Sequence, residues 1–314
     1  MRDHFHTLRQ YLQSVILGQE ALIERLIVGL LAGGHLLLEG MPGLAKTRAV
    51  HALASALAMR FKRIQFTPDL IPGDITGSDI FLPREGRFRF VEGPLFNDII
   101  LADEINRAPP KVQSALLEAM EERQVTVGDS SRPLSPLFTV IATQNPIEQE
   151  GTYPLPEAQL DRFFMKIHID YPDAEAELAI LRQAEAAAAE ATPPGLGAEV
   201  LTQAQRDSAA LYMDEMLARY IVALVQASRQ PGDRDPQLAE WLNHGASPRA
   251  TLALSRAARC LAYLRDRDFV TPDDIMDVAA DVLNHRIGLT FAARAADIGP
   301  RQVVARLLEV VPAP

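Results

Sequence analysis

A glycine-rich segment directly after a short apolar run constrains this chain more than any other feature. The segment Gly40 to Thr47 reads Gly-Met-Pro-Gly-Leu-Ala-Lys-Thr, and it follows the mostly apolar run 35–38. This pattern predicts a buried strand, then a tight loop that opens a helix. Such a loop directs several backbone N–H groups towards a phosphate, and the helix start adds partial positive charge. The segment therefore predicts an α/β fold with a phosphate-binding loop.

The end of this loop carries side chains suited to a nucleoside triphosphate and its metal ion. Lys46 is placed to reach the β- and γ-phosphates, and the Thr47 hydroxyl is placed to bind Mg²⁺. The residue before the lysine departs by one methyl group from the glycine that the general pattern has. The phosphates would be held by the loop residues Gly40, Pro42, Gly43, Leu44 and Ala45.

A second buried strand is expected to end in two carboxylates. Residues 99–102 are apolar, as in central parallel strands covered on both faces, and Asp103 and Glu104 follow them. Asp103 can hold the metal through water, and Glu104 can polarise an attacking water molecule. Together with the loop, these carboxylates predict an enzyme that binds and hydrolyses a nucleoside triphosphate.

Length, charge and cysteine content limit the class of protein. A chain of 314 residues predicts two domains, and its net charge of −10 argues against a surface that coats nucleic acid. The single cysteine, Cys260, cannot form an intramolecular disulfide, which favours a reducing compartment. The first residues lack a signal-peptide pattern, and the most apolar stretch, 26–38, is too short for a membrane helix of roughly 20 residues. We expect a cytoplasmic protein without membrane insertion.

The pattern of strands and helices divides the chain. Strands alternate with helices over 1–171, which predicts an α/β nucleotide-binding domain with helices on both faces of its sheet. Turn residues between extended runs predict hairpin insertions near 71–93 and 124–136. Residues 172–314 predict a helical domain, and its alanine run 186–189 favours helix. Within that domain, helical periodicity covers about 203–229, 247–265 and 272–286.

Several strings in a fixed order resemble the AAA+ ATPases, and within them the MoxR family. They are GMPGLAKT (40–47), DEINRAPPKVQSALLEAMEE (103–122), ATQNP (142–146), EAQLDRF (157–163) and GASPRA (245–250). Alanine before the lysine is usual in that family. The resemblance implies a three-layer αβα core, with a parallel sheet of order 5-1-4-3-2 and a C-terminal all-α lid. The alternating patterns at 62–66 and 163–169 suit the two outer strands.

The resemblance also implies roles for single side chains. Asn145 would orient the attacking water, and Arg162 would act as an arginine finger on the neighbouring subunit's nucleotide. Arg249 would sense the nucleotide, in its own subunit or in a neighbouring one. Arg249 is expected in the first turn of a helix, where a cation is unfavourable, and a phosphate next to it would offset that cost. Without the resemblance, the sequence leaves other interpretations of these side chains open. Asn145 could be a turn residue, and Arg162 could pair with Asp161 or Glu157 of its own chain.

For the whole protein, the resemblance implies ATP hydrolysis with Mg²⁺ at the interfaces of a ring, usually of six subunits. The ring would remodel or mature a protein client, often a von Willebrand factor A domain protein, and sometimes insert a metal cofactor. The alternatives are a helicase-like nucleic-acid motor, disfavoured by the charge, and an ATP-controlled assembly switch with slow turnover.

A basic and aromatic hairpin leaves several functions open. It contains Arg84, Arg87, Phe88, Arg89 and Phe90. Such a hairpin could stack on single-stranded nucleic acid, grip a protein client or contact another subunit. It could also be a solvated hairpin whose apolar face lies on the core.

Overall fold

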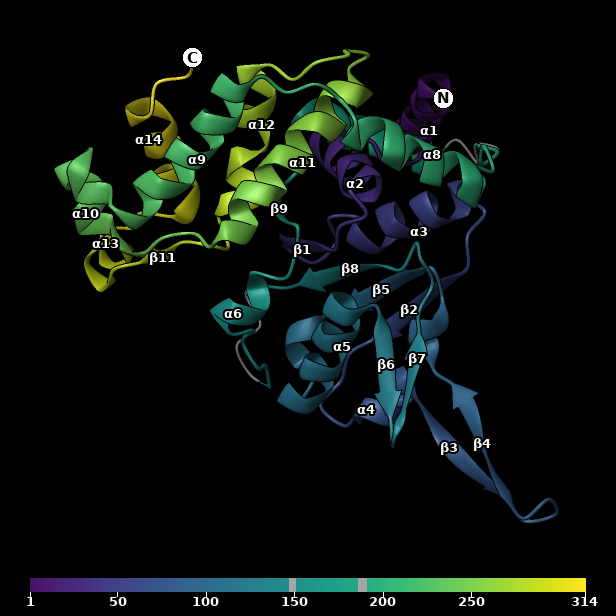
Figure 1. Cartoon of the computed structure of the whole chain (residues 1–314). Coiled ribbons are helices and arrows are strands. Elements are labelled where there is room, and N and C mark those ends of the chain that lie inside the picture. The colour runs from purple at the N-terminus through teal and green to yellow at the C-terminus, as the bar shows by residue number, and fades with distance from the viewer. Residues whose placement is uncertain (147–150, 186–190) are drawn as a thin grey trace.

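A parallel sheet of five strands forms the centre of the N-terminal α/β domain in the computed structural model (Figure 1). The structure describes residues 1–146, 151–185 and 191–314. The strand order is β2-β5-β8-β1-β9. Numbered along the chain, this is the predicted order 5-1-4-3-2, which is therefore confirmed. The strands are β1 Leu36–Gly40, β2 Phe61–Gln65, β5 Ile99–Asp103, β8 Thr139–Gln144 and β9 Met165–Ile169.

The burial of each strand follows its place in the sheet. β5 is buried along its whole length, whereas the edge strand β2 exposes Lys62 and Arg63. β1 lies between β8 and β9, and Leu36 is opposite both Ile141 and Met165. Because all five strands are parallel, the carboxyl ends of β1, β5 and β8 meet at one edge of the sheet, which we call the carboxyl edge.

Helices cover both faces of this sheet, as the three-layer prediction requires. Successive side chains of β1 point to opposite faces, so Leu36 and Leu38 belong to one hydrophobic cluster and Leu37 to the other. The first cluster includes buried residues of α1, α2 and α3, and the second includes those of α4 and α5. These helices are α1 Arg2–Val15, α2 Glu20–Leu31, α3 Lys46–Ala56, α4 Pro72–Thr76 and α5 Pro110–Glu122.

Two hairpins interrupt the strand–helix alternation where the sequence predicts insertions. The first, β3 Gly77–Leu82 with β4 Arg87–Glu92, projects well beyond the rest of the domain (Figure 1). Its rings Phe81 and Phe88 contact each other with centroids 5.2 Å apart and are 50% and 69% exposed. The alternative that the apolar face of this hairpin lies on the core is therefore wrong for Phe88, whereas Phe90 is half-buried and contacts Phe96. The second hairpin is β6 Gln124–Val127 with β7 Ser130–Pro133.

The C-terminal part is helical, as predicted, and contains a short antiparallel ladder in addition. The ladder pairs β10 Leu242–His244 with β11 Gly288–Leu289. The alanine run 186–189 lies outside the described residues. The longer helices are α7 Ala174–Glu185, α8 Ala198–Ala209, α9 Glu215–Arg229, α11 Pro248–Leu264, α12 Pro272–Leu283 and α14 Pro300–Val310. The shorter ones are α10 Pro236–Trp241 and α13 Phe291–Ala295.

One helix prediction in the lid is wrong, because 203–229 is not continuous. The chain leaves the helix after Ala209 and re-enters it at Glu215. Asp214 caps the second helix, since its carboxylate accepts a hydrogen bond of 2.8 Å from the backbone N–H of Met216. Tyr212, between the helices, forms a β-bridge instead. The apolar period continues across the break, and only the cap marks it.

The lid packs on the first two helices of the chain. Helix α11 contacts α1 and α2, and buried residues of all three belong to one hydrophobic cluster. The predicted boundary at 171/172 falls between β9 and α7. Over residues 1–146, 151–185 and 191–314, no helix has both the length and the apolar character that a bilayer span requires.

Candidate functional site

The loop between β1 and α3 depends on two glycines. A Cβ on Gly40 would lie 2.7 Å from the backbone oxygen of Ile169 on β9, so no larger residue fits there. Gly43 has φ +86°, a conformation that other residues rarely adopt. Ala45 also takes a left-handed conformation, with φ 55°, at a cost of roughly 1–2 kcal/mol. The family's alanine therefore keeps a glycine-like backbone.

Lys46 contacts the start of the loop and lies near the carboxylates that follow the second strand. Its Nζ donates a hydrogen bond to the backbone oxygen of Gly40 at the start of the loop. Burial lowers the pKa of Lys46, and the charges of Asp103, Glu104 and Glu39 act in the opposite direction. The amine therefore lies within the field of three carboxylates, where a triphosphate could replace the carbonyl as its partner.

Thr47 and Asp103 supply oxygen atoms suited to Mg²⁺. The Thr47 hydroxyl lies 3.4 Å from Oδ2 of the buried Asp103. Mg²⁺ prefers oxygen ligands and is usually held by one or two protein groups together with phosphates. No group of three or more His, Cys, Asp and Glu residues that could hold a metal ion occurs in the described parts of the chain. The residues present therefore fit Mg²⁺ bound with a nucleotide.

Asp103 has two further partners that the sequence reasoning missed. Thr143 on β8 donates from its hydroxyl to Oδ1 at 2.6 Å. Arg63 on β2 donates to Oδ2 from Nη2 at 2.6 Å and from Nε at 3.0 Å. Arg63 thus occupies Oδ2 of Asp103, the oxygen nearest Thr47. A metal ion at this oxygen would have to displace Arg63 or bind the carboxylate through a water molecule. Sheet order alone could have indicated these neighbours, since β2 and β8 flank β5.

Glu104 is held to one side by its own set of contacts. Its φ is 58°, and its backbone N–H donates to the Thr143 hydroxyl at 2.9 Å. Its Oε2 accepts hydrogen bonds from Gln65 at 2.7 Å and from Arg107 at 3.0 Å. Asn145 directly follows β8 and is buried. Because β8 lies between β1 and β5, Asn145 is placed between the loop and the two carboxylates.

The two predicted arginines, in contrast, lie at the opposite edge of the sheet. Nε of Arg162 is 2.9 Å from Oε2 of Glu121, and the Arg249 guanidinium pairs with the same carboxylate. The intrachain partner of Arg162 is therefore Glu121, not Asp161 or Glu157.

Both arginines line a cavity of about 240 Å³ together with Gly34 and His35. Those two residues precede β1, whereas Gly40 ends it. We call this the amino edge of the sheet. Five residues of strand span roughly 16 Å, so one chain does not bring Arg162 or Arg249 to its own Lys46.

A buried ion pair joins the lid to the Arg162 segment. Arg286, which the sequence reasoning missed, donates from Nε to Oδ1 of Asp161 at 2.9 Å and from Nη1 to the Phe164 carbonyl at 3.1 Å. Burial lowers the pKa of Arg286 to about 10, against the effect of Asp161, which raises it. The Ser247 hydroxyl, at the start of α11, donates to Asp161 Oδ2 at 2.8 Å. Asp161, the residue before Arg162, thus accepts hydrogen bonds from two side chains of the lid.

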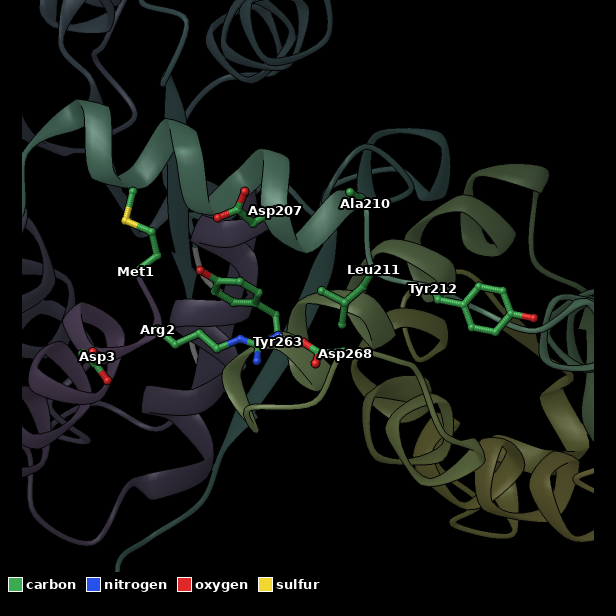
Figure 2. A pocket seen from close by; sticks show the side chains of 9 residues that line it. All are labelled: Met1, Arg2, Asp3, Asp207, Ala210, Leu211, Tyr212, Tyr263 and Asp268. Atoms are coloured by element: carbon green, nitrogen blue, oxygen red, sulfur yellow. Dashed lines mark hydrogen bonds and ion pairs between the residues drawn. The ribbon is translucent and has the colours of Figure 1, made fainter.

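Another cavity, of about 670 Å³, lies beside the start of α1 and is not suited to a nucleotide (Figure 2). Its lining includes the carboxylates of Asp3, Asp207 and Asp268, which would repel a triphosphate. Arg2 is already engaged there, 2.7 Å from Asp268 and 5.1 Å above the ring of Tyr263.

Comparison with known families agrees with this geometry. Residues 35–165 match the model of the ATPase family associated with various cellular activities (AAA), and residues 239–307 match the AAA lid domain. A crystal structure of a candidate ATPase from Cytophaga hutchinsonii superposes with a TM-score of 0.91 at 44% identity, covering 100% of this chain and 96% of that one.

Two curated relatives extend over nearly the whole chain. Chaperone MoxR1 of Mycobacterium tuberculosis is 47% identical, over 98% of this chain and 83% of its own length. Protein MoxR of Methylorubrum extorquens is 32% identical, over 100% of this chain and 96% of its own length. The phosphate loop, the paired carboxylates, the sheet order and these similarities agree, and the chain belongs to the MoxR family of AAA+ ATPases.

Proposed function

We propose that this chain hydrolyses ATP at the interfaces of a closed ring, and that the cycle remodels or matures a protein client. One observation carries the proposal: Lys46 and Glu104 lie at the carboxyl edge of the sheet, whereas Arg162 lies at the amino edge. A head-to-tail contact would bring the amino edge of one copy against the carboxyl edge of the next. Contacts of this type close into rings when the rotation allows, and the family resemblance favours six subunits.

In this proposal each chemical step has a named residue. Lys46 binds the β- and γ-phosphates, and Glu104 accepts a proton from the attacking water that Asn145 orients. Arg162 of the next subunit stabilises the charge on the transferred phosphoryl group. Gln65 now holds the Glu104 carboxylate at 2.7 Å and would have to release it before the proton transfer.

Thr47 and Asp103 would hold Mg²⁺ through their neighbouring oxygens. When bound, the ion neutralises phosphate charge and orients the triphosphate. The Arg63 contact with Asp103 leaves that carboxylate charge-paired in the absence of metal.

We infer from the family resemblance that the client is a protein with a von Willebrand factor A domain in the cytoplasm, in some cases one that receives a metal cofactor. The exposed Phe81 and Phe88 at the projecting hairpin offer apolar surface to such a client. The net charge of −10 disfavours a nucleic-acid track.

The Glu104→Gln variant tests the proposal. It should bind ATP with unchanged affinity but release phosphate at least about 100-fold more slowly, because the general base is lost. Glu215→Gln, which alters an exposed acid on α9, serves as the matched control and should turn over normally. An ATP-dependent pull-down with Glu104→Gln should retain the client. Unchanged turnover would remove Glu104 as the base, and stimulation by nucleic acid at physiological salt without any retained protein would favour a motor.

A further inference from the structure

A cavity of about 450 Å³ on the lid side of the amino edge is lined by four arginines and no carboxylate. We call it the arginine cavity. It lies between α8, α11 and the ends of α2 and α5, and the sequence reasoning did not single it out. Its arginines are Arg123, Arg206, Arg256 and Arg259.

Backbone carbonyls, rather than acids, hold three of these guanidiniums. Arg123 donates to the carbonyls of Pro136 at 2.7 Å and Gly33 at 3.0 Å. Arg256 donates to the carbonyl of Ala32, and Arg259 to that of Leu211 at 2.9 Å. A carbonyl orients a guanidinium without cancelling its charge, and each guanidinium has five N–H donors. Donors and charge therefore remain for a ligand.

Several buried or half-buried arginines elsewhere in the chain pair with carboxylates. Arg25 pairs with Asp281 at 2.8 Å, and Arg306 pairs with Asp235 at 2.6 Å. The chain has ten more acids than basic residues, so acids are not scarce. Within the described residues, none of the four cavity arginines makes such a pair. The arginine cavity thus gathers four positive charges with no carboxylate in its lining, in a chain that is acidic overall.

Grouping these charges has an electrostatic cost. Burial, and then the charge of Arg256, lower the pKa of Arg123. Arg123 also ends α5 in a left-handed conformation with φ 50°, where glycine is usual. The guanidinium at this position also ties the end of α5 to the carbonyls of Pro136 and Gly33. A bound anion would remove the repulsion between the four charges.

We propose that the arginine cavity binds a small ligand with two linked phosphate groups. Two phosphates carry about −3 to −4 charges near neutral pH, which matches four guanidiniums. Arginine binds phosphate oxygens in pairs, so each phosphate can engage two arginines. The cavity volume is within the roughly 300–1,000 Å³ of small-molecule sites. Because Gly33 precedes β1 and the phosphate loop follows it, this site is separate from the chain's own nucleotide site.

The smaller cavity beside Arg162 and Arg249 shares a wall with the arginine cavity. Arg123 and Arg256 line both, whereas Arg206 and Arg259 line only the arginine cavity. Substitutions of Arg206 therefore separate the two sites. Arg206 is exposed, which makes its replacement compatible with folding.

Calorimetric titration of pyrophosphate into the full chain carrying Lys46→Ala tests the proposal, because that change disables the phosphate loop. We expect binding to persist, and Arg206→Gln and Arg259→Gln in that background each to weaken it roughly tenfold. Arg219→Gln is the matched control, since Arg219 is exposed on α9 and pairs with Glu215. Circular dichroism verifies that each variant is folded. Absence of binding to Lys46→Ala, or equal affinity in all variants, overturns the proposal.

A second measurement localises the ligand. Cys260 is the only cysteine of the chain and lines the arginine cavity. Because the thiol is buried and its pKa is raised to about 11, alkylation is followed by mass spectrometry at alkaline pH over hours; pyrophosphate should slow it in Lys46→Ala but not after Arg206→Gln is added. An equal effect of pyrophosphate on Cys260 in both proteins would show that binding occurs elsewhere.

Discussion

Mixing two inactive variants tests whether the site is divided between subunits. Glu104→Gln damages the carboxyl edge of the sheet, and Arg162→Ala damages the amino edge, where its guanidinium now pairs with Glu121. Alone, Arg162→Ala should lose roughly 10³ to 10⁵ in rate, as for arginine fingers in related NTPases. A contribution within one chain would require Arg162 to act across the roughly 16 Å of β1, so any activity of the mixture must come from contact between chains.

The expected size of the rescue follows from the division of the site. An interface is intact only when its carboxyl edge comes from an Arg162→Ala subunit and its amino edge from a Glu104→Gln subunit. With equal amounts mixed at random, this holds for about a quarter of the interfaces in a closed ring of any size. Phosphate release should therefore recover to about a quarter of the wild-type rate if the interfaces act independently.

Matched mixtures make the result specific. Lys46→Ala with Glu104→Gln should show no rescue, because both changes damage the same edge and no interface is intact. Arg249→Ala with Glu104→Gln should recover activity only if Arg249 acts on the neighbour's nucleotide. Native mass spectrometry verifies that mixed rings form. Mixed rings of Arg162→Ala and Glu104→Gln without turnover would refute a divided site.

Two further predictions follow from buried hydrogen bonds. Thr143→Val should lower kcat roughly ten- to hundredfold with little change in KM, because it loses hydrogen bonds to both Asp103 and Glu104. Thr143→Ser keeps the hydroxyl and should restore the rate. A valine variant with the wild-type kcat would contradict the positioning role of Thr143. Burial lowers the pKa of His35 from 6.5 to about 4, so the unfolded chain binds a proton at this residue at a higher pH than the folded protein does. The free energy of unfolding should therefore fall by up to about 3 kcal/mol as pH falls from 6.5 to 4. Urea unfolding should show a shallower loss in His35→Gln than in a His4→Gln control, and equal slopes would exclude His35 as the cause.

The sequence predicts the carboxyl edge well because its signals are local. The loop, its helix and the strand before Asp103 each lie within a few residues, and glycines such as Gly43 report the backbone conformation directly. The edge strands were predictable for a similar reason, since an alternating pattern marks a half-covered strand. The roles of Asn145, Arg162 and Arg249 came from the family resemblance, and they stay predictions until the variants are measured.

What the sequence did not reveal depends on contacts between distant segments. Arg63 and Thr143 flank Asp103 only because β2 and β8 are the neighbours of β5. The arginine cavity combines the end of α5 with α8 and α11, which are far apart in the chain. The break between α8 and α9 is a different case, because Asp214 was a visible capping residue inside a continuous apolar period.

The contacts of Asp161 explain how two separate arginines could respond to one neighbouring nucleotide. Asp161 accepts hydrogen bonds from Ser247 and Arg286 of the lid, and it lies 3.8 Å from Arg249. The next residue is Arg162, so the lid is held to the residue that precedes the proposed finger. If a phosphate draws Arg162 and Arg249 away from Glu121, which both now contact, the lid must shift with them. Movement of the lid in one subunit would then depend on the nucleotide of the next, which is the coupling that a remodelling ring requires.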